Sequence, residues 1–133
     1  MAVVRREVVG EILVVFIDQV RLVDTAAIEQ CYREIAELVD KSEERNVLLH
    51  FGRVAFLSSS ALGMLIRLKK KCLGYKVALK LCNISPDIYE VFKITGLNKV
   101  FDIYADAAEA KEAFKEGGHL FFAKRRPSSY EVK

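Results

Sequence analysis

The sequence is poor in the residue types that build disulfide frameworks and metal sites. It has three cysteines, Cys31, Cys72 and Cys82, and two histidines, His50 and His119. An odd number of cysteines, with no C-x-x-C spacing and no nearby histidine pair, argues against both a disulfide framework and a structural zinc site. We therefore predict no metal site and no cofactor, and we expect a reducing, cytoplasmic setting.

Long hydrophobic runs are also missing. The longest unbroken apolar run, Ile12–Ile17, is far shorter than the roughly 20 residues that a membrane-spanning helix needs. The first residues mix short valine runs with Arg5, Arg6 and Glu7, which is not the pattern of a signal peptide. We therefore expect no membrane span and no secretion signal.

The chain has 133 residues, of which 52% are hydrophobic and 29% are charged. This length and balance are typical of one folded domain. The net charge of +3 comes from the last ten residues, which hold four basic residues and one acidic residue, whereas residues 1–123 hold 17 of each. A nucleic-acid-binding domain usually carries its positive charge on a folded face, so we expect no direct nucleic-acid partner. The basic stretch Arg67–Lys71 fits a solvated helix face better than a phosphate-binding patch.

Apolar spacing predicts alternating strands and helices. The segments Val3–Val8 and Glu11–Ile17 predict an antiparallel hairpin, and four helices and three strands follow in alternation. Alternation of this kind indicates an α/β fold, with a mixed, mainly parallel sheet, an N-terminal antiparallel edge and about four helices. The predicted helices begin near Thr25, Ser59, Pro86 and Asp106, and the predicted strands are Val47–Phe51, Val77–Cys82 and Val100–Tyr104. In the second helix, we expect Leu62, Leu65, Ile66 and Leu73 to face inward.

The apolar periodicity fails from Gly117 onward. We expect a domain over residues 1–117 and a basic, mobile tail over 118–133, which proteases would cut after Lys124, Arg125 or Arg126. The adjacent Phe121 and Phe122 leave an alternative open, in which they anchor a docked tail.

Signals for catalysis are weak. Neither histidine is placed as a base for the serine run 58–60, which also lacks the G-x-S-x-G turn of a nucleophile elbow. Phe51-Gly52-Arg53 follows a strand, but it is not a phosphate-binding loop. We therefore predict that the chain is not an enzyme.

The most informative stretch is Phe56–Gly63, where a short loop leads into a helix. One serine suffices to cap the first turn of that helix, so a run of three leaves two to explain. A serine hydroxyl at a helix N-terminus is also suited to phosphorylation, because the helix dipole favours a phosphate there. Local sequence by itself favours capping.

The segments Asn46–Phe51, Val54–Gly63 and Leu81–Leu97 together resemble a STAS domain, the domain of sulfate transporters and anti-sigma factor antagonists. The resemblance covers about residues 3–116. In this family the loop usually reads Asp-Ser-Ser-Gly-Leu-Gly, and the serine after the aspartate is phosphorylated. The resemblance implies that this serine is Ser59, with Ser58 in place of the aspartate and Ala61 in place of the first glycine.

The resemblance implies a partner-switching protein. An unmodified family member binds an anti-sigma factor that is itself a serine kinase, and phosphorylation releases it until a phosphatase resets the cycle. We expect a docking patch around Ser59, formed by Asp24, Ser58, Ser60, Ala61, Met64 and Arg67. The alternative is a scaffold or sensor module that binds a partner or a small ligand without being phosphorylated.

Overall fold

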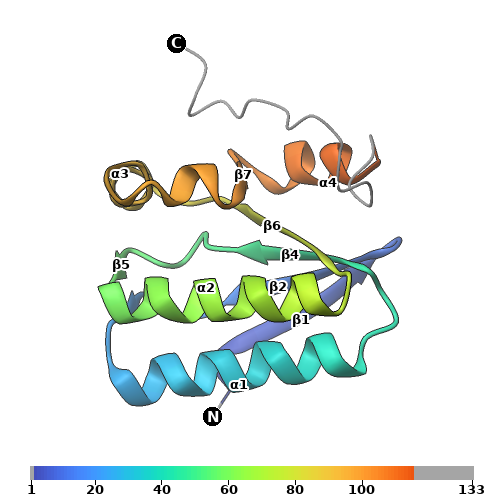
Figure 1. Ribbon diagram of the computed structural model, residues 1–133, viewed down its shortest axis with the longest axis horizontal. Helices are drawn as coiled ribbons and strands as arrows, with labels where there is room; N and C mark the ends of the chain where they lie inside the picture. Colours follow the sequence, from blue (N-terminus) through green and yellow to red (C-terminus); the bar gives the residue numbers. More distant parts are fainter. Residues whose placement is uncertain (1, 116–133) are drawn as a thin grey trace.

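A β-hairpin opens the chain, and a four-helix α/β arrangement follows it. The computed structural model describes residues 2–115 (Figure 1). β1 (Val4–Val9) and β2 (Ile12–Ile17) pair antiparallel, with Val9 opposite Ile12. The turn between them contains Gly10, whose φ of +62° lies in the left-handed region that glycine adopts without steric cost. The predicted antiparallel edge is therefore confirmed.

The main sheet has five strands in the order β1-β2-β4-β6-β7. β4 (Asn46–His50), β6 (Ala78–Cys82) and β7 (Asp102–Tyr104) continue from β2, and all pairings after the hairpin are parallel. Three helices lie in the long crossovers that parallel neighbours need, and a fourth follows β7. These are α1 (Thr25–Lys41), α2 (Ser59–Gly74), α3 (Pro86–Thr95) and α4 (Ala107–Lys115).

The helices divide unequally between the two faces of the sheet. The larger core cluster joins one face of the sheet to α1, α2 and α3, whereas α4 packs on the other face through Ala110, Ala113 and Phe114. α1 and α2 lie side by side and run in the same direction (Figure 1). Their apolar stripes follow the 3.6-residue period, as in Leu65, Leu68 and Cys72 of α2.

One inward residue of the second helix was predicted wrongly. Leu73 is 50% exposed, because it lies a further 100° around α2 from the buried Cys72 and so leaves the stripe. Leu62 and Leu65 are buried as predicted, and Ile66 is half-buried.

Three short elements were not predicted. β3 (Arg21–Leu22) and β5 (Phe56–Leu57) form a separate two-stranded parallel sheet, and the 3₁₀ helix η1 (Leu97–Lys99) follows α3. Elements of two or three residues are too short to produce an apolar period.

The parallel strands give the molecule two distinct ends. The carboxyl end of the sheet, where β2, β4 and β6 finish, is followed by the N-termini of α1, α2 and α3. The amino end, where these strands begin, is preceded by the C-termini of α1 and α2. Within residues 2–115, no helix is long and apolar enough to cross a membrane. The predicted tail over 118–133, and His119 with it, lies outside the described residues.

Candidate functional site

The two-stranded sheet holds the serine run at the carboxyl end of the main sheet. The N–H groups of Ala55 and Phe56 donate to the carbonyl of Val20 at 2.8 and 3.0 Å, and Arg21 and Leu22 pair with Phe56 and Leu57. The segment before α1 and the segment before α2 are thereby tied together. This connection places the beginnings of the two helices at one end of the molecule.

Ser58 is the cap of α2. Its backbone is extended, its Oγ accepts from the N–H of Ala61 at 3.2 Å, and its own N–H donates to the carbonyl of Leu22 at 3.2 Å. The half-buried Ser58 is therefore held on both sides and satisfies one orphan N–H of the first turn. It does so without the carboxylate that the family loop usually carries at this position.

Ser59 and Ser60 form the exposed start of α2. Both are exposed residues of the first turn, and the capping bond is made by Ser58. The two hydroxyls are thus not needed to cap the helix. Gly63, one turn further on, is also exposed, and a Cβ added there would meet no atom within 4 Å.

Ala61 and Met64 do not belong to this surface. Ala61 is fully buried and Met64 is 3% exposed, so the expectation that they surround Ser59 in a docking patch is corrected. The two residues lie three apart on the helix and share its inward face with Leu65 and Leu68. By packing in the core, they hold the first turn of α2 in place, and they do not line the surface.

Asp24 and Arg67 have partners of their own at the edge of the site. The carboxylate of the exposed Asp24 caps α1 by accepting from the N–H of Ala27 at 3.0 Å. Arg67 lies across the seam between α1 and α2, where its guanidinium is 3.9 Å from the Tyr32 ring centroid and 3.1 Å from the Glu29 carboxylate. Both side chains are exposed, and each has an evident local structural role.

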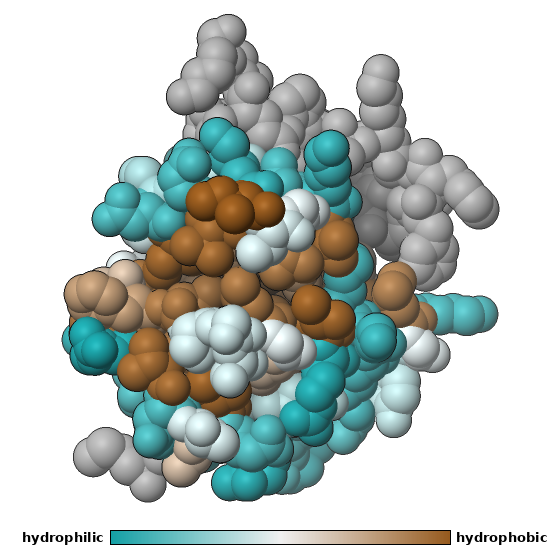
Figure 2. All heavy atoms as spheres, turned by 60° about the vertical axis from the view of Figure 1, so that its left-hand side comes forward, coloured by the Kyte–Doolittle hydropathy of each residue, from teal (hydrophilic) through white to brown (hydrophobic). Residues whose placement is uncertain are grey.

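Exposed apolar side chains lie around the serines, and they were missed from the sequence. Phe56 of β5 is 51% exposed, and Val20, just before β3, is 52% exposed. Val23, just after β3, is exposed as well. The Arg21 guanidinium lies 4.7 Å from the Phe56 ring centroid. Figure 2, which turns this end toward the viewer, shows hydrophobic side chains gathered there. In the sequence, the only indication of this apolar surface is that a stretch predicted to be loop contains apolar residues.

The His50 side chain lies on the opposite face of the sheet from α2 and Ser59. His50, at the end of β4, contacts Phe16 with 4.8 Å between ring centroids, and Phe16 packs with the cluster under α4. α2 covers the opposite face of the sheet. Burial lowers the pKa of His50, with smaller contributions from Arg5 and Lys111. Its Nδ1 accepts from the Gly52 N–H at 3.1 Å, which requires the neutral ring. His50 is thus placed to act as a structural acceptor and not as a base for the serine run.

The three cysteine thiols are poorly placed to act as nucleophiles. Cys31, Cys72 and Cys82 are free and buried, and burial raises their pKa values to about 12, 11 and 12. The thiolate is the nucleophilic form, so these residues react poorly at neutral pH. Within residues 2–115, no group of three or more His, Cys, Asp or Glu side chains could hold a metal ion.

The comparisons with known proteins agree with this architecture. The family model for the STAS domain matches residues 4–110. The chain is 35% identical, over 94 residues, to BtrV of Bordetella bronchiseptica, a protein provisionally named an anti-sigma factor antagonist; the match covers 71% of this chain and 80% of BtrV.

Solved structures show the same fold. A STAS domain protein from Planctomyces limnophilus superposes with a TM-score of 0.73 at 23% identity, covering 84% of this chain and 97% of that one. SpoIIAA from Bacillus, in its phosphorylated form, superposes with a TM-score of 0.62 at 23% identity, covering 84% of this chain and 98% of that one. The chain therefore belongs to the STAS domain family, within its group of anti-sigma factor antagonists.

Proposed function

We propose that this protein is a phosphorylation-controlled partner switch that binds an anti-sigma factor, with Ser59 as the residue that is modified. The observation that carries the proposal is that different serines of the run cap the helix and face the solvent. Ser58 makes the cap, and Ser59 is left exposed in the first turn of a capped helix. SpoIIAA, which has this fold, is known in a phosphorylated form. The setting is the cytoplasm, where a kinase has access to ATP.

The unmodified surface offers what a protein partner needs. Val20, Val23 and Phe56 supply exposed apolar area beside Ser59, while Ser60, Asp24 and Arg67 supply a polar border. An apolar centre with a polar rim is the usual anatomy of a protein interface. Ala61 and Met64 contribute by holding the first turn in place, not by touching the partner.

Phosphorylation moves a large charge into this interface. The Ser59 Oγ attacks the γ-phosphorus of ATP, an O–P bond forms as the bond to the β-phosphate oxygen breaks, ADP leaves, and a base of the kinase takes the hydroxyl proton. The phosphate adds about −1.5 to −2 charges. Burying that charge without a counter-charge costs several kcal/mol, and each ~1.4 kcal/mol weakens binding tenfold. A phosphatase resets the site by hydrolysis: water attacks the phosphorus, the O–P bond to Ser59 breaks, inorganic phosphate leaves, and the serine hydroxyl is restored.

Incubation with the cognate anti-sigma factor kinase and ATP, followed by intact mass and site mapping, tests the proposal. We expect one phosphate per chain, retained in Ser60→Ala and absent in Ser59→Ala. Phosphate on Ser58 or Ser60 in the Ser59→Ala chain would contradict the assignment of Ser59.

A second candidate function rests on the two departures from the family loop. Ser58 replaces the aspartate beside the acceptor, and Ala61 replaces a glycine. If the partner binds but no phosphate is incorporated, the protein acts as a constant scaffold or sensor module.

A further inference from the structure

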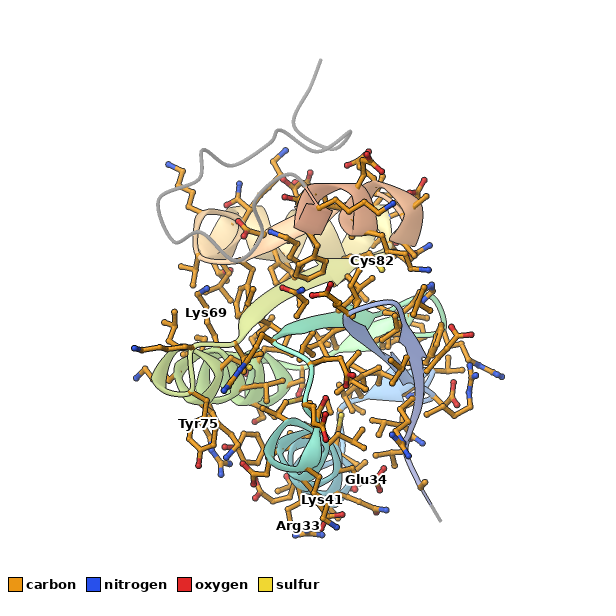
Figure 3. All side chains as sticks on the ribbon, turned by 90° about the vertical axis from the view of Figure 1, so that its right-hand side faces the viewer. Arg33, Glu34, Lys41, Lys69, Tyr75 and Cys82 are labelled. Carbon is orange, nitrogen blue, oxygen red and sulfur yellow. The ribbon has the colours of Figure 1, made fainter. Side chains whose placement is uncertain are left out.

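A groove lies between the edge strand β1 and the C-terminal part of α1, at the amino end of the sheet. Its volume is about 520 Å³. Val8, Leu13 and Leu38 supply its apolar lining, and Val8 is 46% exposed. Figure 3 looks at this end of the molecule, where Lys41 ends α1 and β1 lies beside the helix. An apolar side chain is thus left open to solvent beside the edge of the sheet.

The strand β1 presents unpaired main-chain groups next to this groove. Within residues 2–115, β1 pairs only with β2, so its other side is an edge. The N–H of Val4 points to that edge, since it donates to the Glu34 carboxylate at 3.1 Å. Main-chain directions alternate along a strand, so the N–H and C=O groups of Arg6 and Val8 point to the same edge. Because Glu34 occupies the edge at Val4, Arg6 and Val8 form its open part.

We propose that this edge pairs with the same edge of a second copy of the chain, so that two sheets join through antiparallel β1 strands in a twofold dimer. A twofold axis perpendicular to the sheet keeps the α1 side of both copies on one face, and the same residues then meet from both sides. Pairing centred on Glu7 places Arg6 of each copy opposite Val8 of the other. Residues opposed in this way exchange both of their main-chain hydrogen bonds.

The contact between Glu34 and the start of β1 selects this register. Pairing centred on Arg6 would place Val8 of one copy opposite Val4 of the other. Val4 is only 8% exposed and its N–H is already bonded to Glu34, so it cannot complete that pair. The same register would set Arg6 directly opposite Arg6 of the second copy, which is unfavourable for like charges. Pairing centred on Glu7 avoids both conflicts.

The charge of the groove supports the same pairing. In this register, Arg6 of the second copy lies beside Val8, at the mouth of the groove. Three glutamates line the rim of the groove: Glu37, Glu43 and Glu44. Lys41, a cation of the same rim, is already paired with Glu37 at 3.6 Å. The rim therefore offers negative charge to Arg6 of the second copy, and the exposed Glu43 is available to receive it.

The charges on the other face of the joined strands also balance. Glu7 lies opposite Glu7 of the second copy at the twofold axis, and this contact by itself is repulsive. Arg5 of each copy lies diagonally across from Glu7 of the other, within reach of a long side chain. The Arg5 guanidinium bonds to Asp18 through two of its nitrogens and has further N–H groups for Glu7. The two arginines therefore flank the two carboxylates.

The dimer leaves the serine surface open. The paired part of β1 lies toward the amino end of the sheet, whereas Ser59 begins α2 at the carboxyl end. The inference is therefore independent of the proposed switch, and the antiparallel strands direct the two Ser59 surfaces away from each other. An interface of a few residues a side belongs to the small class that is typical of weak, reversible association.

Sedimentation velocity and residue-resolved amide exchange by NMR on the full chain test the proposal. We expect the dimer fraction to rise between about 10 µM and about 1 mM, as for a small interface. Over this range the amides of Arg6 and Val8 should become several-fold more protected, while those of Arg5 and Glu7, which face β2, stay unchanged. A monomer at the highest concentration would overturn the proposal, as would a dimer that leaves Arg6 and Val8 unprotected. Protection of these amides in a monomer would assign the edge to another segment of the same chain and also overturn it.

A proline on the edge tests the main-chain pairing. Val8→Pro removes an N–H that β2 does not use, and proline is tolerated at such a position of an edge strand. We expect dimerisation to weaken about tenfold. Val8→Thr keeps the N–H and the β-branched shape, so it is the matched control and should dimerise as the wild type does. Equal dimerisation of the proline variant and the wild type would contradict the pairing.

A charge reversal tests the register and needs no change in the backbone. Arg6→Glu places a carboxylate against the acidic rim of the second copy, so dimerisation should weaken several-fold. Arg6→Glu/Glu43→Arg restores opposite charges across the interface and should recover most of the loss. Unchanged dimerisation in Arg6→Glu, or no recovery in the double variant, would show that Arg6 does not meet this rim and would overturn the register.

Discussion

At the carboxyl end of the sheet four helices begin, whereas at the amino end helices finish. The helices that begin must satisfy free N–H groups, and α1, α2 and α3 each do so with one side chain, Asp24, Ser58 or Ser85. At the amino end, the loop after α1 is closed by Ser42, which bonds to Glu44, and an apolar groove is left open beside it. Polar residues in excess of the caps, such as Ser59 and Ser60, are therefore available for another task.

The largest effect we expect is a loss of partner affinity from a substitution at the carboxyl end, which a substitution at the amino end should not cause. Ser59→Asp should weaken binding of the anti-sigma factor at least tenfold, about 1.4 kcal/mol, because a charge enters the interface. The helix dipole interacts favourably with a negative side chain in the first turn, so the free energy of unfolding of the variant should not fall. Titration calorimetry and thermal unfolding measure the two quantities.

The control for this prediction lies at the other end of the sheet. Glu43→Lys changes the charge by a larger amount at the rim of the groove, and it should leave the affinity unchanged. A loss of affinity in Glu43→Lys as large as that in Ser59→Asp would show that net charge, and not position, governs binding.

The next effect concerns folding and not binding. Ser58→Ala removes the cap of α2 and should cost about 1 kcal/mol, or roughly 4 °C in Tm. Ser59→Ala removes a hydroxyl that makes no capping bond and should change stability by less than about 0.5 kcal/mol. Urea unfolding of the two variants tests the division of labour directly; equal losses would contradict it.

A smaller effect is expected from the apolar residues around the serines. Phe56→Ser should weaken partner binding several-fold, because it removes exposed apolar area beside Ser59. Val8→Ser removes a similarly exposed apolar side chain at the amino end and is the matched control. We expect its affinity for the anti-sigma factor to equal that of the wild type in surface plasmon resonance.

The smallest effect is a pH dependence at the carboxyl end. Because the pKa of His50 is lowered in the folded state, the unfolded chain takes up the proton first as the pH falls below about 7. Stability from the neutral ring is therefore present above the unfolded pKa, near 6.5, and is lost as the pH falls through the folded pKa. His50→Gln keeps an acceptor for the Gly52 N–H and should reduce the difference between urea midpoints at pH 7.5 and 5.5. An unchanged difference would show that another group is responsible.

Local patterns predicted most of the regular elements. The stripe from Ile28 to Val39, the proline after Ser85 and the glycine after Thr95 each act within one or two turns of a helix, and the helices α1 and α3 lie where these signals predicted them. The resemblance of the loop and of the later helix to the STAS family implied the same fold; the family match confirms the family, and the solved structures confirm the fold.

The sequence by itself determined the order of strands and helices, the hairpin and the serine that can cap α2, since these depend on periodicity and on contacts a few residues apart. Only the tertiary structure decided that Leu73 is exposed, that Ala61 and Met64 are buried, and that Arg67 rests on Tyr32. The same holds for β3 and β5, whose two-residue strands pair across more than 30 positions of the chain. The physical reason is that burial and pairing of this kind depend on which element packs opposite, and that partner comes from a distant part of the sequence.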